Sequence, residues 1–327
     1  MGKRKSSELT WSHNSDTTAI HSILQYTDRV GLTLIEVMGY TAHAFRMIID
    51  RQEVEVGSYS FFDWKSNHAA AFSNLGLTVK STGQQTNEPP TPEEWEEGLH
   101  FIQESIDKGV PALSWDLFIP EWGVIYGYDD DKKLLRCRDV RKDGELPYEK
   151  LGRGEVTELY VMTVTGSRPV DRKTMLSGAL RMAVDHARNQ AFPSQNSHRN
   201  GLAAYDAWTE AFTNRSVNAF GNCVNAGKIS DSREFASAFL AHIVSGWEGN
   251  SLADQELRAA AQEASYHYGK VADRLCEVFT MFPFPRGGEP NVDEQANQAL
   301  TLLREAKSEE EQGVRILERM LELLEQA

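Results

Sequence analysis

Carboxylates and aromatic rings gather around three short apolar segments in the middle of the chain. The segments cover residues 109–116, 121–129 and 133–139. Their length and their Gly and Pro punctuation predict three buried strands. Glu121 begins the second strand and Asp139 ends the third, so we expect a carboxylate pair on neighbouring strands, which can perform acid–base chemistry when burial separates their pKa values. The alternative is that both are solvated or paired with arginines: Arg46, Arg136 and Arg138.

Hydroxyl groups near the start of the chain offer a nucleophile. Three of them lie on or near the first turns of a helix predicted over residues 16–29: Thr17, Thr18 and Ser22. A hydroxyl needs a base within hydrogen-bond reach. His21 diverges from Ser22 by about 100° around a helix, which leaves His43, in the following loop, as the candidate base. The alternatives are that the threonines cap the helix and that His43 packs beside Phe45.

Aromatic residues of the central strands would form a flat-walled cleft for an apolar or amphipathic ligand. The candidate ligand-binding residues are Thr18, Ser22, Arg46, Trp115, Trp122 and Tyr126. Strand alternation places Trp122 and Tyr126 on one face, a pattern that core packing also explains. The sequence has no HExxH, P-loop or GxGxxG motif and no close Cys–His cluster, so we expect no metal and no cofactor.

Composition restricts the class of protein. The 327 residues carry a formal net charge of −14, which argues against a general nucleic-acid binder. The three cysteines are widely spaced, so neither a disulfide framework nor a zinc site is expected. No apolar run approaches the roughly 20 residues of a membrane span. We therefore expect a cytoplasmic protein that does not bind membranes.

The periodicity of the sequence predicts two domains after a flexible segment over residues 1–15. Residues 16–166 read as an α+β domain with a largely antiparallel sheet, and residues 167–327 as a helical bundle. Helices of the first domain are predicted at about 16–29, 32–38, 62–75 and 92–108, with further strands near 77–80 and 158–165. Bundle helices are predicted at about 172–190, 199–213, 231–247, 252–281 and 293–325. Asp231 and Glu234 are expected to form a capping box that begins the third bundle helix.

Three short motifs carry a resemblance to known families. Gly109-Val110-Pro111-Ala112, then Gly127-Tyr128-Asp129, then a strand ending in Asp139 resemble the second half of a papain-like cysteine peptidase domain of the bacteriocin-processing type. Residues 38–46, MGYTAHAFR, are similar to the N-terminal domain of butirosin biosynthesis protein H and its bacterial relatives. Residues 201–208, GLAAYDAW, look like part of the helical domain that follows in that group.

The resemblance implies a thiolate at the start of the first long helix and an imidazole on the strand before the Gly-Tyr-Asp turn. It also implies an acidic or amide residue at the end of the next strand, which orients the imidazole. In this chain the first predicted helix has no cysteine, and Glu121 stands at the histidine position. Only Asp139 keeps the orienting role. Cys137 lies two residues earlier, and we expect it to be a core residue.

Three functions follow as hypotheses. The first is a pseudoenzyme that binds a small molecule or an acyl-carrier-linked partner in the inherited cleft. The second is an acyl or aminoacyl transferase, or an amide hydrolase, of a biosynthetic pathway, with Glu121, Asp139 and His43 as its catalytic residues. The third is an interaction module whose acidic last helix docks a partner. That helix either seals the bundle within one chain or joins two chains in a homodimer.

Overall fold

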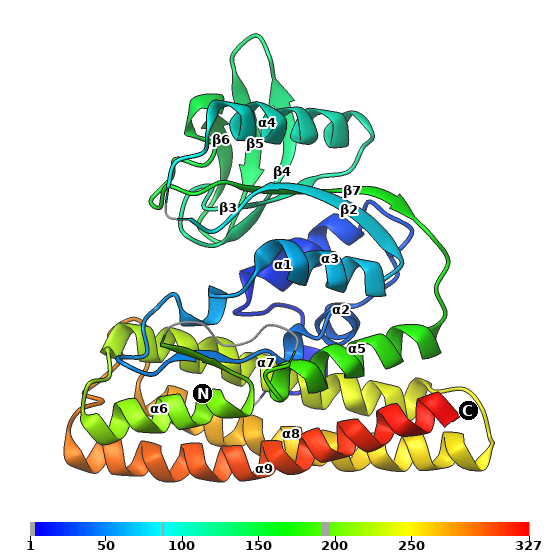
Figure 1. Ribbon diagram of the computed structural model, residues 1–327, viewed down its shortest axis with the longest axis vertical. Coiled ribbons are helices and arrows are strands. Elements are labelled where there is room, and N and C mark those ends of the chain that lie inside the picture. The colour runs from blue at the N-terminus through cyan, green and yellow to red at the C-terminus, as the bar shows by residue number, and fades with distance from the viewer. Residues whose placement is uncertain (1–3, 87, 191–196, 327) are drawn as a thin grey trace. The chain divides into compact units, whose positions relative to one another are not determined.

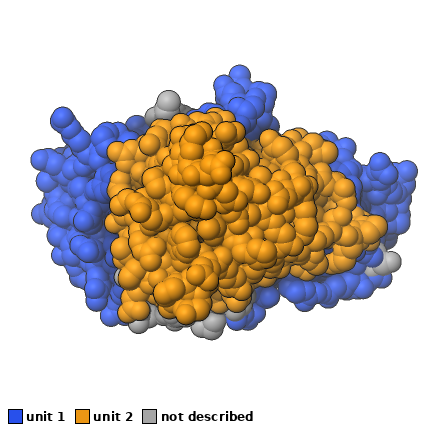
Figure 2. All heavy atoms as spheres, turned by 90° about the horizontal axis from the view of Figure 1, so that it is seen from above, with its two compact units in different colours: residues 1–13, 38–62, 172–327 blue, residues 14–37, 63–171 orange. Residues whose placement is uncertain are grey.

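The computed structural model describes residues 4–86, 88–190 and 197–326. These residues form two compact units, coloured separately in Figure 2. Unit 1 comprises Met1–His13, Met38–Phe62 and Arg172–Ala327, and unit 2 comprises Asn14–Val37 and Asp63–Asp171. Residues 38–62 thus belong with the helical unit, and the last passage from unit 2 to unit 1 lies between residues 171 and 172. Residues 1–3 of the expected flexible segment lie outside the described residues.

Unit 2 is built on a six-stranded antiparallel sheet with the strand order β2-β7-β3-β4-β5-β6. The strands are β2 (Leu77–Gly83), β3 (Ala112–Trp115), β4 (Trp122–Asp129), β5 (Leu134–Arg138), β6 (Asp143–Pro147) and β7 (Tyr160–Ser167). The three central strands, the largely antiparallel sheet and the α+β class are thus confirmed. The edge strand β6 was not predicted, because Leu146 is its only buried residue and it ends in a proline.

Helices cover both faces of this sheet. They are α1 (Ser15–Leu24), α3 (Trp64–Asn74) and α4 (Pro92–Asp107), and α2 (Leu34–Tyr40) runs from unit 2 into unit 1. Figure 1 shows α4 on one side of the sheet and α1 and α3 on the other. α4 begins with a full capping box, in which Thr91 and Glu94 bond each other's backbone N–H, as its sequence predicts. α1 begins at Ser15, one residue before the predicted start, and ends five residues early.

Unit 1 is mainly helical. Its helices are α5 (Arg172–Ala187), α6 (Leu202–Asn214), α7 (Ala219–Gly246), α8 (Leu252–Met281) and α9 (Asp293–Gln326). α8 packs along α7 and α9, and α9 also contacts α5 and α6, so the predicted C-terminal helical region is confirmed (Figure 1). Residues 199 and 200, predicted as the start of a helix over 199–213, instead belong to β8 (His198–Asn200), which pairs with β1 (Ile48–Asp50). No helix in the described ranges has the length and apolar character needed to cross a membrane.

The predicted capping box at Asp231 and Glu234 is wrong. α7 begins twelve residues earlier, with the Asn218 side chain accepting from Gly221 N, so both acids lie in the middle of a helix and are buried. There they bind Arg4, whose guanidinium forms ion pairs with both carboxylates. The described part of the N-terminal segment is thus held by specific contacts.

The short 3₁₀ helices are Ser6–Glu8, His43–Phe45, Ser58–Ser60 and Tyr148–Lys150.

Candidate functional site

A serine and a glutamate meet at the N-terminus of α1. The Ser15 hydroxyl donates a hydrogen bond to Glu121 Oε2, and the backbone N–H of Trp122 donates to Ser15 Oγ at 3.1 Å. Glu121 immediately precedes β4, so the start of that strand brings its carboxylate to the first turn of α1. Ser15 is buried. A hydroxyl and a carboxylate are therefore in direct contact where a helix presents its positive end.

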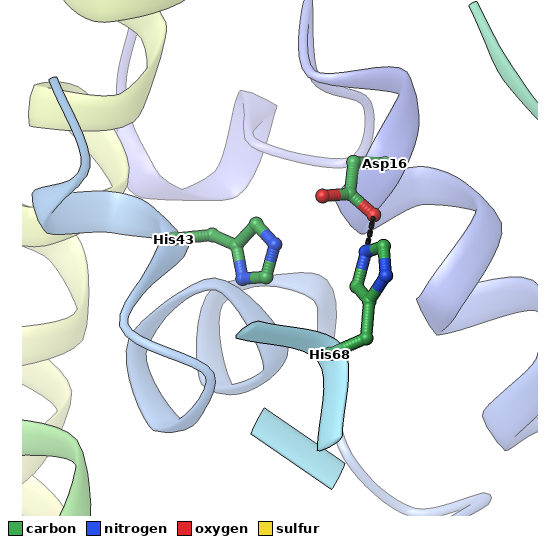
Figure 3. Close-up of side chains that lie close together, drawn as sticks. All are labelled: Asp16, His43 and His68. Atoms are coloured by element: carbon green, nitrogen blue, oxygen red, sulfur yellow. Dashed lines mark hydrogen bonds and ion pairs between the residues drawn. The ribbon is translucent and has the colours of Figure 1, made fainter. Parts of the chain in front are cut away.

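The next residue of α1 joins a second polar network, drawn in part in Figure 3. His68 Nε2 of α3 lies 2.9 Å from Asp16 Oδ1, and His68 Nδ1 lies 3.0 Å from the Tyr160 hydroxyl of β7. All three side chains are buried. Both ring nitrogens of His68 are therefore engaged, and the network holds the first turn of α1 against α3 and the sheet. Sequence reasoning missed this network because its members come from three elements far apart in the chain.

Tryptophans fill the same face of the sheet. Trp115 and Trp122 lie opposite each other in the β3–β4 register, with ring centroids 5.1 Å apart. Trp64 of α3 lies 5.1 Å from Trp115 and 4.9 Å from Trp122. Tyr126 does not share this environment, because it sits in a β-bulge, is 41% exposed and donates its hydroxyl to Asp143. The candidate ligand-binding rings are therefore Trp115 and Trp122 without Tyr126.

Two of the three hydroxyls predicted from the sequence bond backbone carbonyls of α1 and its N-cap. Thr18 Oγ1 donates to Asn14 O at 3.1 Å, and Ser22 Oγ donates to Thr18 O at 2.9 Å. Thr17 Oγ1 is fully buried and makes no hydrogen bond within the described residues, so it is not a cap. The hydroxyl that meets a carboxylate is Ser15, which the sequence analysis assigned to the flexible segment. A helix start placed one residue earlier would have included it.

Asp139 has a local role. Its Oδ2 accepts from Phe118 N at 3.0 Å, and its Oδ1 accepts from Arg141 N at 2.8 Å and Lys142 N at 3.1 Å. Both oxygens therefore organise the loops next to β4 and β5. This arrangement does not match the expected acid–base pair with Glu121, because the carboxylate is committed to backbone donors.

His43 and Arg46 belong to unit 1, where they contact each other. Arg46 Nη2 lies 2.9 Å from His43 Nε2, and His43 Nδ1 lies 2.8 Å from Thr41 Oγ1. A guanidinium can only donate, so the lone pair on His43 Nε2 is the acceptor and the neutral ring carries its proton on Nδ1. The Arg46 guanidinium also lies 3.9 Å from the Phe62 ring centroid. In this arrangement the basic nitrogen of His43 is occupied by Arg46.

Asp116, which has a strained backbone conformation, follows Trp115 at the end of β3. Asp116 is buried, has a left-handed backbone with φ of 52°, and accepts from Val156 N at 2.7 Å. Burial raises the pKa of this carboxyl group.

The Cys137 thiol lies in the core cluster on the face of the sheet that α4 covers. It is buried, and burial raises its pKa. Because a reactive cysteine needs a stabilised thiolate, Cys137 is a core residue and not a nucleophile.

Comparison with protein-family models and with curated proteins gives no match for this chain. The resemblance to papain-like peptidases and to the butirosin group therefore stays an expectation from short motifs.

Proposed function

We propose that unit 2 catalyses acyl transfer, with Ser15 as the nucleophile and Glu121 as the general base. The contact between the Ser15 hydroxyl and the Glu121 carboxylate carries this proposal. Nucleophilic catalysis requires a hydroxyl within hydrogen-bond reach of a base. By the resemblance to papain-like domains, the two residues stand where a thiol and an imidazole would be expected. The reaction class is that of an acyl or aminoacyl transferase or an amide hydrolase.

Acyl transfer at this site takes two steps. Ser15 Oγ attacks the carbonyl carbon of the acyl donor while its proton passes to Glu121. The leaving thiol or amine takes that proton as its bond to the acyl carbon breaks. An acceptor amine or water then attacks the ester carbon while Glu121 takes its proton, and this proton passes to Ser15 Oγ as the ester bond breaks, which restores both residues. The N-terminus of α1 favours the negative charge that develops on the carbonyl oxygen.

A carboxylate is ordinarily a weaker base than an imidazole. We therefore expect acylation to be slower than in an enzyme with a thiol and an imidazole. The test is labelling with a fluorophosphonate probe, followed by intact-mass and peptide analysis. We expect one adduct on Ser15, no adduct on Ser15→Ala, and a rate at least tenfold lower for Glu121→Gln. Ser22→Ala is the matched control, because its hydroxyl bonds Thr18 O on the same helix. Absence of an adduct from the wild-type protein, or equal labelling of Ser15→Ala, would rule out this nucleophile.

A second function is supported by the commitment of the expected catalytic groups to other partners. Asp139 binds loop backbone, His43 Nε2 accepts from Arg46, and both nitrogens of His68 are engaged. This favours a catalytically degenerate papain-like domain that binds a small molecule or an acyl-carrier-linked ligand. The measurement is a titration with the thioester S-octanoyl-N-acetylcysteamine, followed by tryptophan fluorescence. Saturable binding without release of free thiol supports the binding function, and thiol release that Ser15→Ala abolishes supports the enzyme.

A further inference from the structure

His198 of β8 is held by a carboxylate through one ring nitrogen and is unpaired at the other. Its Nε2 lies 2.9 Å from Glu55 Oε1, and its ring stacks on the Phe61 ring with centroids 3.8 Å apart. The residue is 5% exposed, and its Nδ1 has no hydrogen-bond partner in the described ranges. A carboxylate can only accept, so the neutral ring donates from Nε2 and keeps its lone pair on Nδ1. Because buried polar atoms are almost always bonded, this lone pair points to a ligand.

Asp50 of β1 lies directly across from His198 in the β1–β8 register. The next pair along the ladder is hydrogen-bonded, since Arg51 N donates to Ser197 O at 3.1 Å. Hydrogen-bonded and non-hydrogen-bonded pairs alternate in an antiparallel ladder, and the non-hydrogen-bonded pairs have the closer side chains, with Cα atoms about 4.5 Å apart. Asp50 and His198 form such a pair, so their side chains are neighbours on one face of the two strands.

The Asp50 carboxylate uses only one of its two oxygens. Oδ2 accepts from Gln52 N at 3.2 Å and from Glu53 N at 2.9 Å, which fixes the group beside its own strand. Oδ1 is buried and has no partner among residues 4–86, 88–190 and 197–326, and the residue is 3% exposed. Two neighbouring side chains of unit 1 therefore each have an unused, buried lone pair.

The chemistry of these two atoms restricts what binds them. Both are acceptors, and Asp50 and Glu55 place two carboxylates around one imidazole. The guanidinium of Arg199 donates to the backbone oxygen of His198 at 2.8 Å and leaves both acceptors unpaired. Either a cation or a water molecule satisfies a nitrogen lone pair and a carboxylate oxygen together, and the two carboxylates favour the cation. Imidazole nitrogen and carboxylate oxygen are ordinary ligands of Zn²⁺, at about 2.0–2.2 Å.

We propose that His198 Nδ1 and Asp50 Oδ1 bind a divalent transition-metal ion, of which Zn²⁺ is the reference. Glu55 then holds the imidazole by its other nitrogen, the arrangement that commonly supports metal-binding histidines. Two protein ligands leave coordination positions open for water or an anionic ligand. The site belongs to unit 1 and is independent of the function proposed for unit 2. Motif inspection missed it because Glu55 and His198 are 143 residues apart in the chain.

The test is calorimetric titration of the whole, chelator-treated chain with Zn²⁺, together with the visible absorption of bound Co²⁺. We expect a saturable site and a rise in melting temperature with Zn²⁺. Asp50→Asn keeps an oxygen for Gln52 N and Glu53 N and replaces the unpaired oxygen by an N–H₂ group. It should weaken Zn²⁺ binding by at least tenfold and leave the melting temperature of the metal-free protein unchanged or higher.

Two further variants separate the metal ligand from its support. His198→Phe keeps a ring to stack on Phe61 and removes the nitrogen ligand, so binding at this site should be lost. Glu55→Gln leaves both metal ligands in place, and we expect the affinity for Zn²⁺ to fall by about 10- to 100-fold, as when the partner of a metal-binding histidine is removed. Circular dichroism checks the fold of each variant. If His198→Phe does not fold, Asp50→Asn decides the question.

His267→Phe is the matched control, because His267 Nδ1 lies 2.7 Å from Glu309 Oε2 in the same unit. It should bind Zn²⁺ with wild-type affinity. Absence of Zn²⁺ binding by the wild-type protein would assign the two lone pairs to water and overturn the proposal. Wild-type affinity in Asp50→Asn or in folded His198→Phe would also overturn it, as would an equal loss of affinity in His267→Phe.

Discussion

Arg233 and Glu310 form a bidentate ion pair inside the helical unit. Arg233 Nε lies 2.9 Å from Glu310 Oε2 and Arg233 Nη2 lies 2.5 Å from Glu310 Oε1, and both side chains are buried. The Tyr205 hydroxyl donates to Glu310 Oε2 at 2.7 Å, and Arg233 Nη1 donates to the carbonyl oxygens of Ala44 and Arg46 at 3.0 Å. One charge pair therefore connects α7, α6, α9 and residues 44–46.

Glu310→Gln should destabilise the protein strongly. It leaves the buried Arg233 guanidinium without its counter-charge, which typically costs about 3–5 kcal/mol in the free energy of unfolding. Urea denaturation followed by circular dichroism measures this change. The exposed pair of Arg188 and Glu318 supplies the control, and Glu318→Gln should change the free energy by less than about 1 kcal/mol. A Glu310→Gln variant as stable as this control would show that the pair is dispensable.

Arg4→Gln should loosen the N-terminal segment from α7. Arg4 binds Asp231 and Glu234, which are both buried in the middle of that helix. Because the guanidinium itself is partly exposed, we expect a loss of about 1–3 kcal/mol, below the range for a fully buried pair. Differential scanning calorimetry tests this against Arg181→Gln, which breaks an exposed ion pair with Glu325. Equal melting temperatures for the two variants would contradict it.

His186 should make unit 1 sensitive to acid. Burial, assisted by the positive charges of Arg46 and Arg233, lowers the pKa of His186 to about 3. Its Nε2 lies 3.0 Å from both Met47 N and Met47 O. The unfolded chain takes up a proton below about pH 6.5, while the folded ring stays neutral, so stability falls as the pH drops from 6.5 toward 3.

The upper limit for this group is about 1.4 kcal/mol per pH unit, and the measured slope should lie below it because residue His186 is half-buried. The free energies of unfolding of the wild-type protein and of His186→Gln are measured from pH 7 to pH 4, and the slope of each against pH is compared. The variant should have the shallower slope. Identical slopes would show that His186 does not titrate differently in the folded and unfolded states.

Gly154→Ala should strain the loop beside β3. A Cβ at this position would lie 2.6 Å from both the Cγ and the backbone O of Asp116, whose own backbone is already left-handed. Such overpacking typically costs about 1–3 kcal/mol. Gly31→Ala is the control, because a Cβ there meets nothing within 4 Å. Chemical denaturation of both variants should separate them, and similar midpoints would contradict the steric argument.

The sequence predicted those elements whose signals are local. Thr91 and Glu94 define the start of α4 by neighbouring residues alone, and the apolar central strands are bounded by Gly and Pro. The start of α7 was missed because Gly221 and Asn222 in its first turn lower helix propensity. Asp231 and Glu234 have the spacing of a capping box, but in the structure they form tertiary ion pairs with Arg4.

The candidate site was predicted only in part for the same reason. Glu121 stood out by its place before a strand, but its partner Ser15 is 106 residues away in the chain. The contact of Asp16 with His68 spans 52 residues, and no periodicity reveals such a pair. The prediction that Trp122 and Tyr126 share one face of the sheet does not hold, because a β-bulge between Ile125 and Gly127 shifts the alternation of side chains along β4.

The division of the chain between the units has a consequence for biosynthesis on the ribosome. The chain passes from one unit to the other at 13/14, 37/38, 62/63 and 171/172. Every segment of unit 2 has been synthesised once residue 171 is made, so that unit can fold while translation continues. In unit 1, β1 must wait for β8, and the carbonyls of Ala44 and Arg46 must wait for Arg233. Its earliest segments therefore lack these partners on the nascent chain until α7 has been synthesised.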